Sequence, residues 1–594
     1  MKNSITISHA LCGIVAALLS SCAIWAQLEL SSHEPLLLFV FAALVYFYNT
    51  SFRHMCPATF SAAAICAVLF AAFSVMGNLY ALGDRRAWML WVLIRFVGLA
   101  VFYALILNLV FAKLKNVNLL LPSDQKRNMS TKTRLRVFVL CWLPIALCFL
   151  VWWLYEFPGN TSPDSNNQIM QAMGLLPLSS NHPAVSTLVL GLFYNAGLKL
   201  FSGDQNAALS LFTLFQLLFM SAVFAYLAET LYEARLKNWV IAVVVLVYLL
   251  IPHHASYSVT VWKDVIFSGW GTALCVSLWR LLLRFERDEQ TKGKAFDISM
   301  LYLSALGASL YRNGIYYAFF LLFPFFFAIF RKKSVAAWLM PILVPIIAII
   351  INGPVFSSSD ISHNDFIESH SLPAQHIARV IKDGHELSVE QYELLSKAVD
   401  VEAVAETYNA GVADPIKALI RKTGDMQYIE ENLDDYTRLW IDLGLKYPGA
   451  YVRAQIDQTK GYWYPDVSYW SMMNHCVDSD YLTIFKDRQL PNWWCNIFDS
   501  VYFYLPSLPL AGLIYSIGTA TWTLIALFAL CIAKGLKKEL LIYVPVLAVV
   551  LAVCFVTPVY AEYRYVYPLF TTLPLLGVLP FTHVNCHNDA EVNK

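Results

Sequence analysis

The sequence predicts an all-α polytopic membrane protein, and three observations indicate this class. Of its 594 residues, 58% are hydrophobic and 14% are charged, whereas a soluble protein carries roughly 25% charged residues. Mean hydropathy is +0.55. Apolar segments long enough to cross a bilayer recur along the chain, and lipid requires that they be helical or form a closed barrel. Roughly 13 to 14 transmembrane helices are expected from their lengths. The net charge of +1 argues against nucleic acid as a partner.

The first five spans are expected near residues 11–26, 35–49, 60–82, 88–112 and 137–154. Residues 11–26 could also be read as a signal peptide, but further spans follow at once and the preceding region is weakly charged, so a first membrane helix is favoured. The segment 113–136 is rich in Lys and Arg, which marks a cytoplasmic loop. The N-terminus is therefore predicted to be cytoplasmic.

The next loop, about 155–183, should lie on the outer face and is the candidate catalytic loop. It holds the lone carboxylate Asp164 beside several amides and ends at His182-Pro183, where apolar sequence resumes. A polar loop against a membrane with one carboxylate and one imidazole suits acid–base chemistry. The alternative is an ordinary solvated connection.

Two apolar segments follow, 184–201 and 207–231, before the cations Arg235 and Lys237. Two full crossings cannot connect an outer loop to an inner one. One segment must lie in the interface or re-enter, or the charge rule fails here, and the sequence leaves this open.

Further ionisable residues are expected at the outer ends of helices. Charge parity places Lys263 and Asp264 there, together with Arg312 and the run from Glu562 to Tyr565. Charges at such depths are costly and are candidates for function. Arg564 offers the planar fork that phosphate oxygens accept. The alternative for each is a structural salt bridge at a helix end.

One sizeable soluble segment, 357–500, is predicted on the outer side, between a module 1–356 and the C-terminal helices 501–594, which end in a short cytoplasmic tail. Its aromatic run 461–470 could be a platform for sugars or could rest on lipid headgroups, and the second interpretation is favoured. Cys476 and Cys495 lie on the predicted oxidising side and are expected to form a disulfide.

These spaced features together resemble the GT-C superfamily of membrane glycosyltransferases, which use polyprenyl-phosphate sugars. The likeness is greatest to a bacterial group with PG…DS..Q, HP and KD elements, which here are Pro158-Gly159, Asp164-Ser165, Gln168, His182-Pro183 and Lys263-Asp264. The chain departs from many members because Asp164 lacks a second acidic neighbour and because the soluble segment lies between late helices.

The resemblance implies a reaction and a set of site residues. Asp164, Asp264 and His182 would be catalytic, with Asp164 as the base. The donor would be bound by Arg564, Glu562, Tyr565, Arg312, Lys263, Asn181 and Gln168. A divalent metal, Mg or Mn, could be held by Asp164 and Asp264, although the missing acidic neighbour puts metal dependence in doubt.

The expected function is transfer of a sugar from a polyprenyl-phosphate donor to a glycan, lipid or protein acceptor at the outer face of the cytoplasmic membrane. A flippase or transporter for a lipid-linked sugar is the first alternative, although no internal inverted repeat is visible. An oligosaccharide polymerase or ligase is the second, because it shares the substrate class and the large outer segment.

Overall fold

The computed structural model describes residues 2–31, 34–79, 88–122, 127, 130–179, 182–287, 293–356, 366–467 and 469–582. Within these ranges the chain forms 26 α-helices, short 3-10 helices, one π-helix (Ile351–Val355) and isolated β-bridges, with no β-strand. Six helices are long and apolar enough to cross a membrane, or seven if one bent pair counts as a span, and six more apolar helices are shorter. The predicted class, an all-α polytopic membrane protein, is therefore confirmed. The predicted number of spans remains a prediction.

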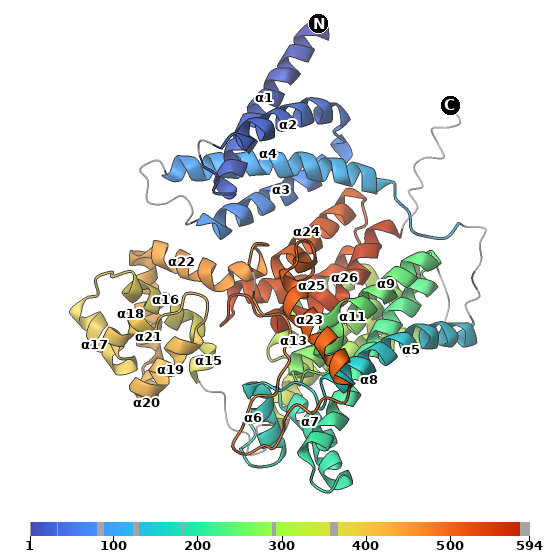
Figure 1. Cartoon of the computed structure of the whole chain (residues 1–594), viewed down its shortest axis with the longest axis vertical. Helices are drawn as coiled ribbons and strands as arrows, with labels where there is room; N and C mark the ends of the chain where they lie inside the picture. The colour runs from blue at the N-terminus through green and yellow to red at the C-terminus, as the bar shows by residue number, and fades with distance from the viewer. Residues whose placement is uncertain are drawn as a thin grey trace.

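The first four helices form a layer of their own, drawn in blue in Figure 1. They are α1 (Lys2–Gln27), α2 (Leu36–Ser51), α3 (Pro57–Gly77) and α4 (Trp88–Lys115). The layer packs on α24 through α3 and α4: Phe70 of α3 stacks on Trp522 with ring centroids 4.1 Å apart, and Tyr103 of α4 lies edge-on to the same ring.

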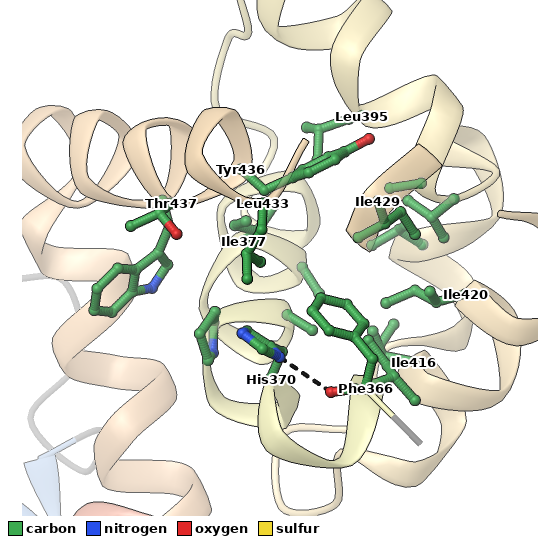
Figure 2. A pocket seen from close by; sticks show the side chains of 18 of the residues that line it. Phe366, His370, Ile377, Leu395, Ile416, Ile420, Ile429, Leu433, Tyr436 and Thr437 are labelled. Carbon is green, nitrogen blue, oxygen red and sulfur yellow. Dashed lines mark hydrogen bonds between the residues drawn. The ribbon is translucent and has the colours of Figure 1, made fainter. Parts of the chain in front are cut away.

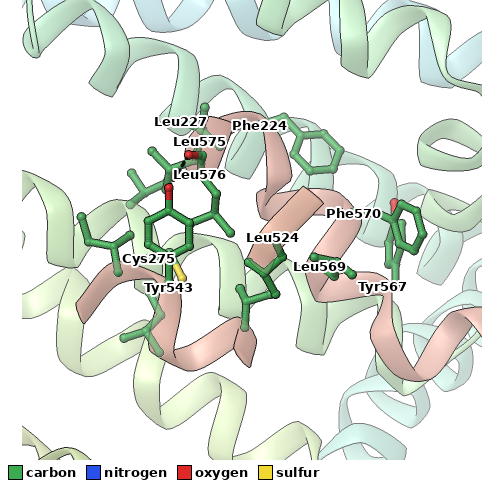
Figure 3. Close-up of a cluster of buried hydrophobic side chains, with 14 of the residues drawn as sticks. Phe224, Leu227, Cys275, Leu524, Tyr543, Tyr567, Leu569, Phe570, Leu575 and Leu576 are labelled. Atoms are coloured by element: carbon green, nitrogen blue, oxygen red, sulfur yellow. Dashed lines mark hydrogen bonds between the residues drawn. The ribbon is translucent and has the colours of Figure 1, made fainter. Parts of the chain in front are cut away.

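The central bundle holds most of the hydrophobic core. It consists of α5 (Thr131–Tyr155), α8 (Gln205–Glu233), α9 (Asn238–Leu250), α10 (Pro252–Ser258), α11 (Lys263–Glu286), α12 (Lys294–Tyr311), α13 (Ile315–Phe330), α14 (Val335–Ile350), α24 (Ile517–Ala533), α25 (Leu540–Phe555) and α26 (Tyr567–Val578). Figure 3 shows part of its core, where Tyr543, Tyr567 and Leu576 lie among leucines. Tyr543 is fully buried and its hydroxyl donates to the Leu576 carbonyl at 2.7 Å, so the buried polar group is satisfied.

One end of this bundle is fixed by buried charges that we call the helix-end cluster. It joins the start of α5, the ends of α8 and α11 and the start of α12, and its members are Arg134, Glu229, Glu233, Arg280, Arg284 and Asp297. The Arg280 side chain has no exposed surface and lies within 2.8 Å of all three carboxylates. The guanidinium is thus fully enclosed by acids, as a buried charge requires.

The two apolar segments 184–201 and 207–231 form a hairpin of α7 (Ala184–Leu200) and α8. The start of α8 bonds to the soluble segment: Asn206 Nδ2 donates to the Phe485 carbonyl at 3.0 Å. Gln216 Nε2 donates to the Thr260 carbonyl at 2.7 Å, and Glu229 lies in the helix-end cluster. Only the later part of α8, about 25 Å at 1.5 Å per residue, therefore runs along the bundle. α7 is 17 residues long and is one of the shorter apolar helices, and its place relative to the membrane stays a prediction.

The soluble segment contains a compact helical domain with its own core. Its helices are α15 (Phe366–Ser369), α16 (Ser371–Lys382), α17 (Val389–Ala398), α18 (Val401–Thr407), α19 (Asp414–Thr423), α20 (Met426–Glu431), α21 (Leu433–Lys446) and α22 (Pro448–Thr459), coloured yellow to orange in Figure 1. A cavity of about 110 Å³ lies in this core and is seen in Figure 2, where His370 Nδ1 bonds to the Phe366 carbonyl.

After this domain the chain is mostly extended up to α23 (Asn492–Tyr504). This extended stretch returns to the membrane bundle and contacts α6 (Pro163–Ala172) and the loop before it. Segments far apart in the sequence therefore meet at one end of the bundle, opposite the helix-end cluster.

Candidate active site

The loop before α6 is held between two other segments by backbone hydrogen bonds. On one side Asn160 N donates to the Val259 carbonyl at 3.1 Å, and Val261 N donates back to Asn160 at 2.9 Å. On the other side Thr161 exchanges the same kind of bonds with residues 475–477, each 3.2 Å long. Three extended segments thus lie side by side. The starts of α6 and α11 are brought together by this pairing.

Side chains fix the two helix starts further. Ser162 and Ser165 form a capping box at the start of α6, as expected for a Ser that precedes a helix. Trp262 Nε1 donates to Ser162 Oγ at 2.9 Å, and Ser165 Oγ donates to the Val261 carbonyl at 2.6 Å. Asp164 and Asp264 consequently occupy the first turns of α6 and α11, where the helix dipole favours a carboxylate.

Two arginines from distant parts of the chain pair with these carboxylates. Arg564 Nη1 lies 2.6 Å from Asp164 Oδ2, and Arg312 Nη1 lies 3.2 Å from Asp264 Oδ1. Arg312 also donates to the Tyr565 carbonyl at 3.4 Å. The predicted residues of α6, α11, the α12–α13 junction and the run before α26 therefore meet in one place.

The third cation, Lys263, contacts His182. Lys263 Nζ lies 3.1 Å from His182 Nδ1, and because an ammonium only donates, Nδ1 must be the accepting nitrogen. Burial and the charge of Lys263 lower the pKa of His182 to about 4. The imidazole is then neutral at pH 7 and carries its proton on Nε2, so it offers a hydrogen-bond donor rather than a base.

Glu562 is the third carboxylate and differs from the other two. Its side chain is 4% exposed, and its Oε1 lies 3.6 Å from Arg564 Nε, which is longer than a hydrogen bond. Burial raises the pKa of Glu562 to about 7, against the opposing charge of Arg564. About half of these carboxyls are protonated at neutral pH.

Asp164 remains ionised. Burial raises the pKa of Asp164, but the charges of Arg564 and Lys263, the Arg564 hydrogen bond and, in the acid range where it is protonated, the charge of His182 outweigh burial and hold the pKa below its usual value. Its side chain is 41% exposed, so it is the accessible carboxylate of the group. We name Asp164, His182, Lys263, Asp264, Arg312, Glu562 and Arg564 the site cluster.

Several buried polar atoms of the site cluster have no hydrogen-bond partner among the described residues. They are Asp264 Oδ2, Glu562 Oε1 and Arg564 Nε. An unpaired buried polar atom costs about 1–3 kcal/mol, which a bound ligand would recover. The pairing inside the cluster is thus incomplete.

An apolar groove begins one turn from the site cluster. Its volume is about 320 Å³, and it lies between α11, α13 and α25. Phe267, Ile315 and Pro568 line it and stand three residues after Asp264, Arg312 and Tyr565. The Arg312 guanidinium lies over the Phe267 ring, 5.4 Å from its centroid. A hydrocarbon chain in the groove would therefore end beside the cations.

A model of a protein family of unknown function, DUF6020, matches residues 173–594, well over half of the chain. The chain belongs to this family. No curated protein and no solved structure matches it. The matched region of this DUF6020 protein contains the whole site cluster except Asp164, which precedes it.

One predicted donor-binding residue, Gln168, does not join the site cluster, and a second lies outside the described residues. Gln168 Nε2 donates to Ser186 Oγ at 2.9 Å and to Thr187 Oγ1 at 3.1 Å. Gln168 therefore links α6 to α7, and its amide nitrogen bonds to α7 and not to the charged residues of the site cluster. Asn181 lies outside the described residues.

The predicted disulfide is not formed in this DUF6020 protein. Cys476 and Cys495 are both free thiols. Cys476 Sγ contacts the Gly159 carbonyl at 3.2 Å, and Cys495 Sγ contacts the Leu490 carbonyl at 3.5 Å. Cys476 lies in the stretch paired with the α6 loop, whereas Cys495 lies in the first turn of α23, so packing holds the sulfurs apart.

The donor atoms of the site do not fit a divalent cation. Among the described residues, no group of three His, Cys, Asp or Glu side chains is arranged to hold a metal ion. Asp164 and Asp264 are instead each engaged by an arginine. Mg²⁺ prefers several oxygen ligands, and the surrounding cations would repel it.

Sequence reasoning missed a second carboxylate in the loop 155–183. Glu156 is fully buried and bonds to Lys486 Nζ at 2.9 Å, while Lys486 also donates to Asn160 Oδ1 at 2.6 Å. This pair fastens the loop before α6 to the stretch that follows the helical domain. Its only sequence signal was a carboxylate directly after an apolar span, which is a weak one.

Proposed function

We propose that this DUF6020 protein is a membrane glycosyltransferase of the GT-C type, acting on a polyprenyl-phosphate sugar. The observation that carries the proposal is the position of three cations, Lys263, Arg312 and Arg564, at the end of an apolar groove. A lipid phosphate has this combination of an apolar chain and an anionic head. The groove would hold the hydrocarbon chain of the lipid, and the cations would bind its phosphate.

The charge of the site cluster supports anion binding. Three cations face two arginine-paired carboxylates, Asp164 and Asp264. The third carboxyl, Glu562, adds less negative charge, because its pKa is about 7 and it is neutral in about half of the molecules at neutral pH. Arg564 contributes a planar fork that can hold two phosphate oxygens. The neutral His182 would add an Nε2–H donor. Positive charge at a departing phosphate stabilises the transition state.

Asp164 would be the general base. The acceptor hydroxyl gives its proton to Asp164, its oxygen forms a bond to the anomeric carbon, and the bond between that carbon and the phosphate oxygen breaks. The electron pair leaves with the polyprenyl phosphate. This single displacement inverts the anomeric centre and needs no covalent enzyme intermediate.

The Asp164–Arg564 pair would couple donor binding to catalysis. In the absence of ligand, Arg564 lowers the pKa of Asp164 and so weakens it as a base. A donor phosphate competes for Arg564, which draws the guanidinium away and raises the basicity of Asp164. The base would then be fully active only when a donor is present.

The reaction would take place at the outer face of the cytoplasmic membrane, on a cell-envelope glycan, lipid or protein as acceptor. The cation-rich loops 113–136 and 331–333 support this side for the site cluster through the positive-inside rule. The helical domain would then be extracytoplasmic.

Purified protein in lipid nanodiscs with a radiolabelled polyprenyl-phosphate sugar tests the proposal. We expect released polyprenyl phosphate and a labelled product, both absent with Asp164→Asn and present with Asp480→Asn, a control at an exposed carboxylate outside the site. Release of a diphosphate from a lipid-diphosphate donor would identify a polymerase or ligase. In proteoliposomes, intact lipid moved across the bilayer would identify a transporter. Either result would overturn the proposal.

A further inference from the structure

A second pocket lies next to the site cluster, on the side of the soluble segment. Its volume is about 390 Å³, within the range of small-molecule sites. It lies between α23 and the stretch that contains the end of the aromatic run. Its lining residues include Tyr469, Trp470, Ser471, Asn474, His475 and Tyr502.

We infer that this pocket binds a sugar ring of the acceptor, which rests on the proposed transferase function and names its acceptor as a glycan. The carbon–hydrogen faces of a pyranose are apolar and pack on aromatic rings, while its hydroxyls need hydrogen-bond partners. The lining combines both kinds of group.

An unpaired amide oxygen indicates where a hydroxyl would bind. Asn474 Nδ2 donates to Tyr155 Oη at 2.9 Å and to Asp499 Oδ1 at 3.3 Å. These two acceptors fix the amide, which leaves its Oδ1 buried and without a partner among the described residues. A hydroxyl donor of the ligand would remove the cost of that unpaired acceptor.

Aromatic rings connect the pocket to the site cluster. Trp470 is 40% exposed, and its ring centroid lies 5.7 Å from that of Trp262. Trp262 in turn lies under the Arg564 guanidinium, 5.3 Å from its centroid. Tyr469 packs edge-on against Tyr560, which precedes Glu562 by two residues, with centroids 5.1 Å apart. A sugar on Trp470 would thus lie beside the reacting groups.

The charge of the lining favours a sugar over a phospholipid headgroup. No Lys or Arg is among the lining residues, whereas a headgroup phosphate would need a cation. The nearest cations on this side, Arg488 and Lys486, are already paired with the carboxylates of Asp499 and Glu156. A neutral, hydroxyl-rich ligand therefore suits the pocket, and the aromatic run gains a role in sugar binding in place of the interfacial one expected from sequence.

Saturation-transfer NMR on the full chain in nanodiscs tests this inference without turnover. The probes are methyl β-glycosides of glucose, galactose and N-acetylglucosamine, with glycerophosphoethanolamine as the headgroup probe. We expect transfer to the ring protons of at least one glycoside, reduced at least fivefold in Trp470→Ala and in Tyr469→Ala. Trp494→Ala, a control at a tryptophan that is 39% exposed in the same soluble segment, should keep the signal.

Glycoside binding is measured without turnover, so failure of the sugar pocket can be distinguished from failure of the proposed transferase function. Asp164→Asn should keep glycoside binding, so a failed transfer assay would leave this readout intact. Binding to no glycoside, an unchanged signal in both aromatic variants, or binding of glycerophosphoethanolamine alone would overturn the sugar pocket.

Discussion

The helix-end cluster and the site cluster are built from similar charges but are completed differently. In the helix-end cluster Arg280 touches three carboxylates, and its side chain has no exposed surface. In the site cluster each arginine has one close carboxylate, and Asp164 is 41% exposed. Buried charges that each have several close ionic partners hold helices together, and removing one leaves the others uncompensated. Incomplete pairing at an accessible edge instead leaves charge and donors for a ligand.

The largest effect should come from Asp164, and it should be on activity alone. We expect Asp164→Asn to lower turnover by about two to four orders of magnitude, the usual range for a general base, because the amide cannot accept the acceptor proton. The variant should express and melt like the natural protein, since Asn still accepts a hydrogen bond from Arg564. Sugar transfer from a defined donor measures it. Near-normal turnover in the folded variant would remove Asp164 from the mechanism.

The matching change in the helix-end cluster should damage the fold. Arg280→Met leaves Glu229, Glu233 and Asp297 without their shared cation, and we expect a loss of about 3–5 kcal/mol of stability. Thermal melting of the detergent-purified protein measures it. Arg438→Met is the control, because Arg438 is 76% exposed and 3.6 Å from Asp435, where a surface pair is worth about 0–1 kcal/mol. An unchanged melting temperature in Arg280→Met would mean that the helix-end cluster does not stabilise the fold.

Arg564→Lys should separate phosphate binding from folding. Lys keeps the charge but loses the planar fork, so we expect donor affinity or turnover to fall by about tenfold, the worth of one charge-assisted hydrogen bond. Donor binding and melting are measured on the same preparation. Unchanged donor affinity at equal stability would move the phosphate toward Arg312.

The smallest effect concerns Glu562 and pH. Its pKa of about 7 lies above its ordinary value, so the carboxyl is neutral below pH 7 and ionises as pH rises through 7. The new negative charge partly cancels the cations, and we expect donor Kd to rise about fivefold between pH 6 and 8, which corresponds to ~1 kcal/mol. Glu562→Gln should stay at the low-pH affinity throughout. If the donor Kd of Glu562→Gln changed with pH as it does in the natural protein, the titrating group would be another residue.

Local sequence was informative about this site to an unusual degree. Asp164, Lys263, Asp264, Arg312 and Arg564 could each be chosen because a charge at the end of an apolar span is costly without a purpose. The same reasoning failed for Gln168, whose hydroxyl partners Ser186 and Thr187 lie on the next helix. An amide in a polar loop gives no sign of which neighbour it will bind.

The sequence alone determined the class of the protein and the charges at the ends of its apolar helices, because hydropathy and charge act locally along the chain. Tertiary structure decided which charges pair. Arg564 reaches Asp164 across 400 residues, and no local pattern encodes that contact. Packing also joined α7 and α8 in a hairpin and held the Cys476 and Cys495 thiols apart. Both outcomes depend on where the stretch before α23 returns to the bundle, and that return is set by long-range contacts such as Glu156 with Lys486.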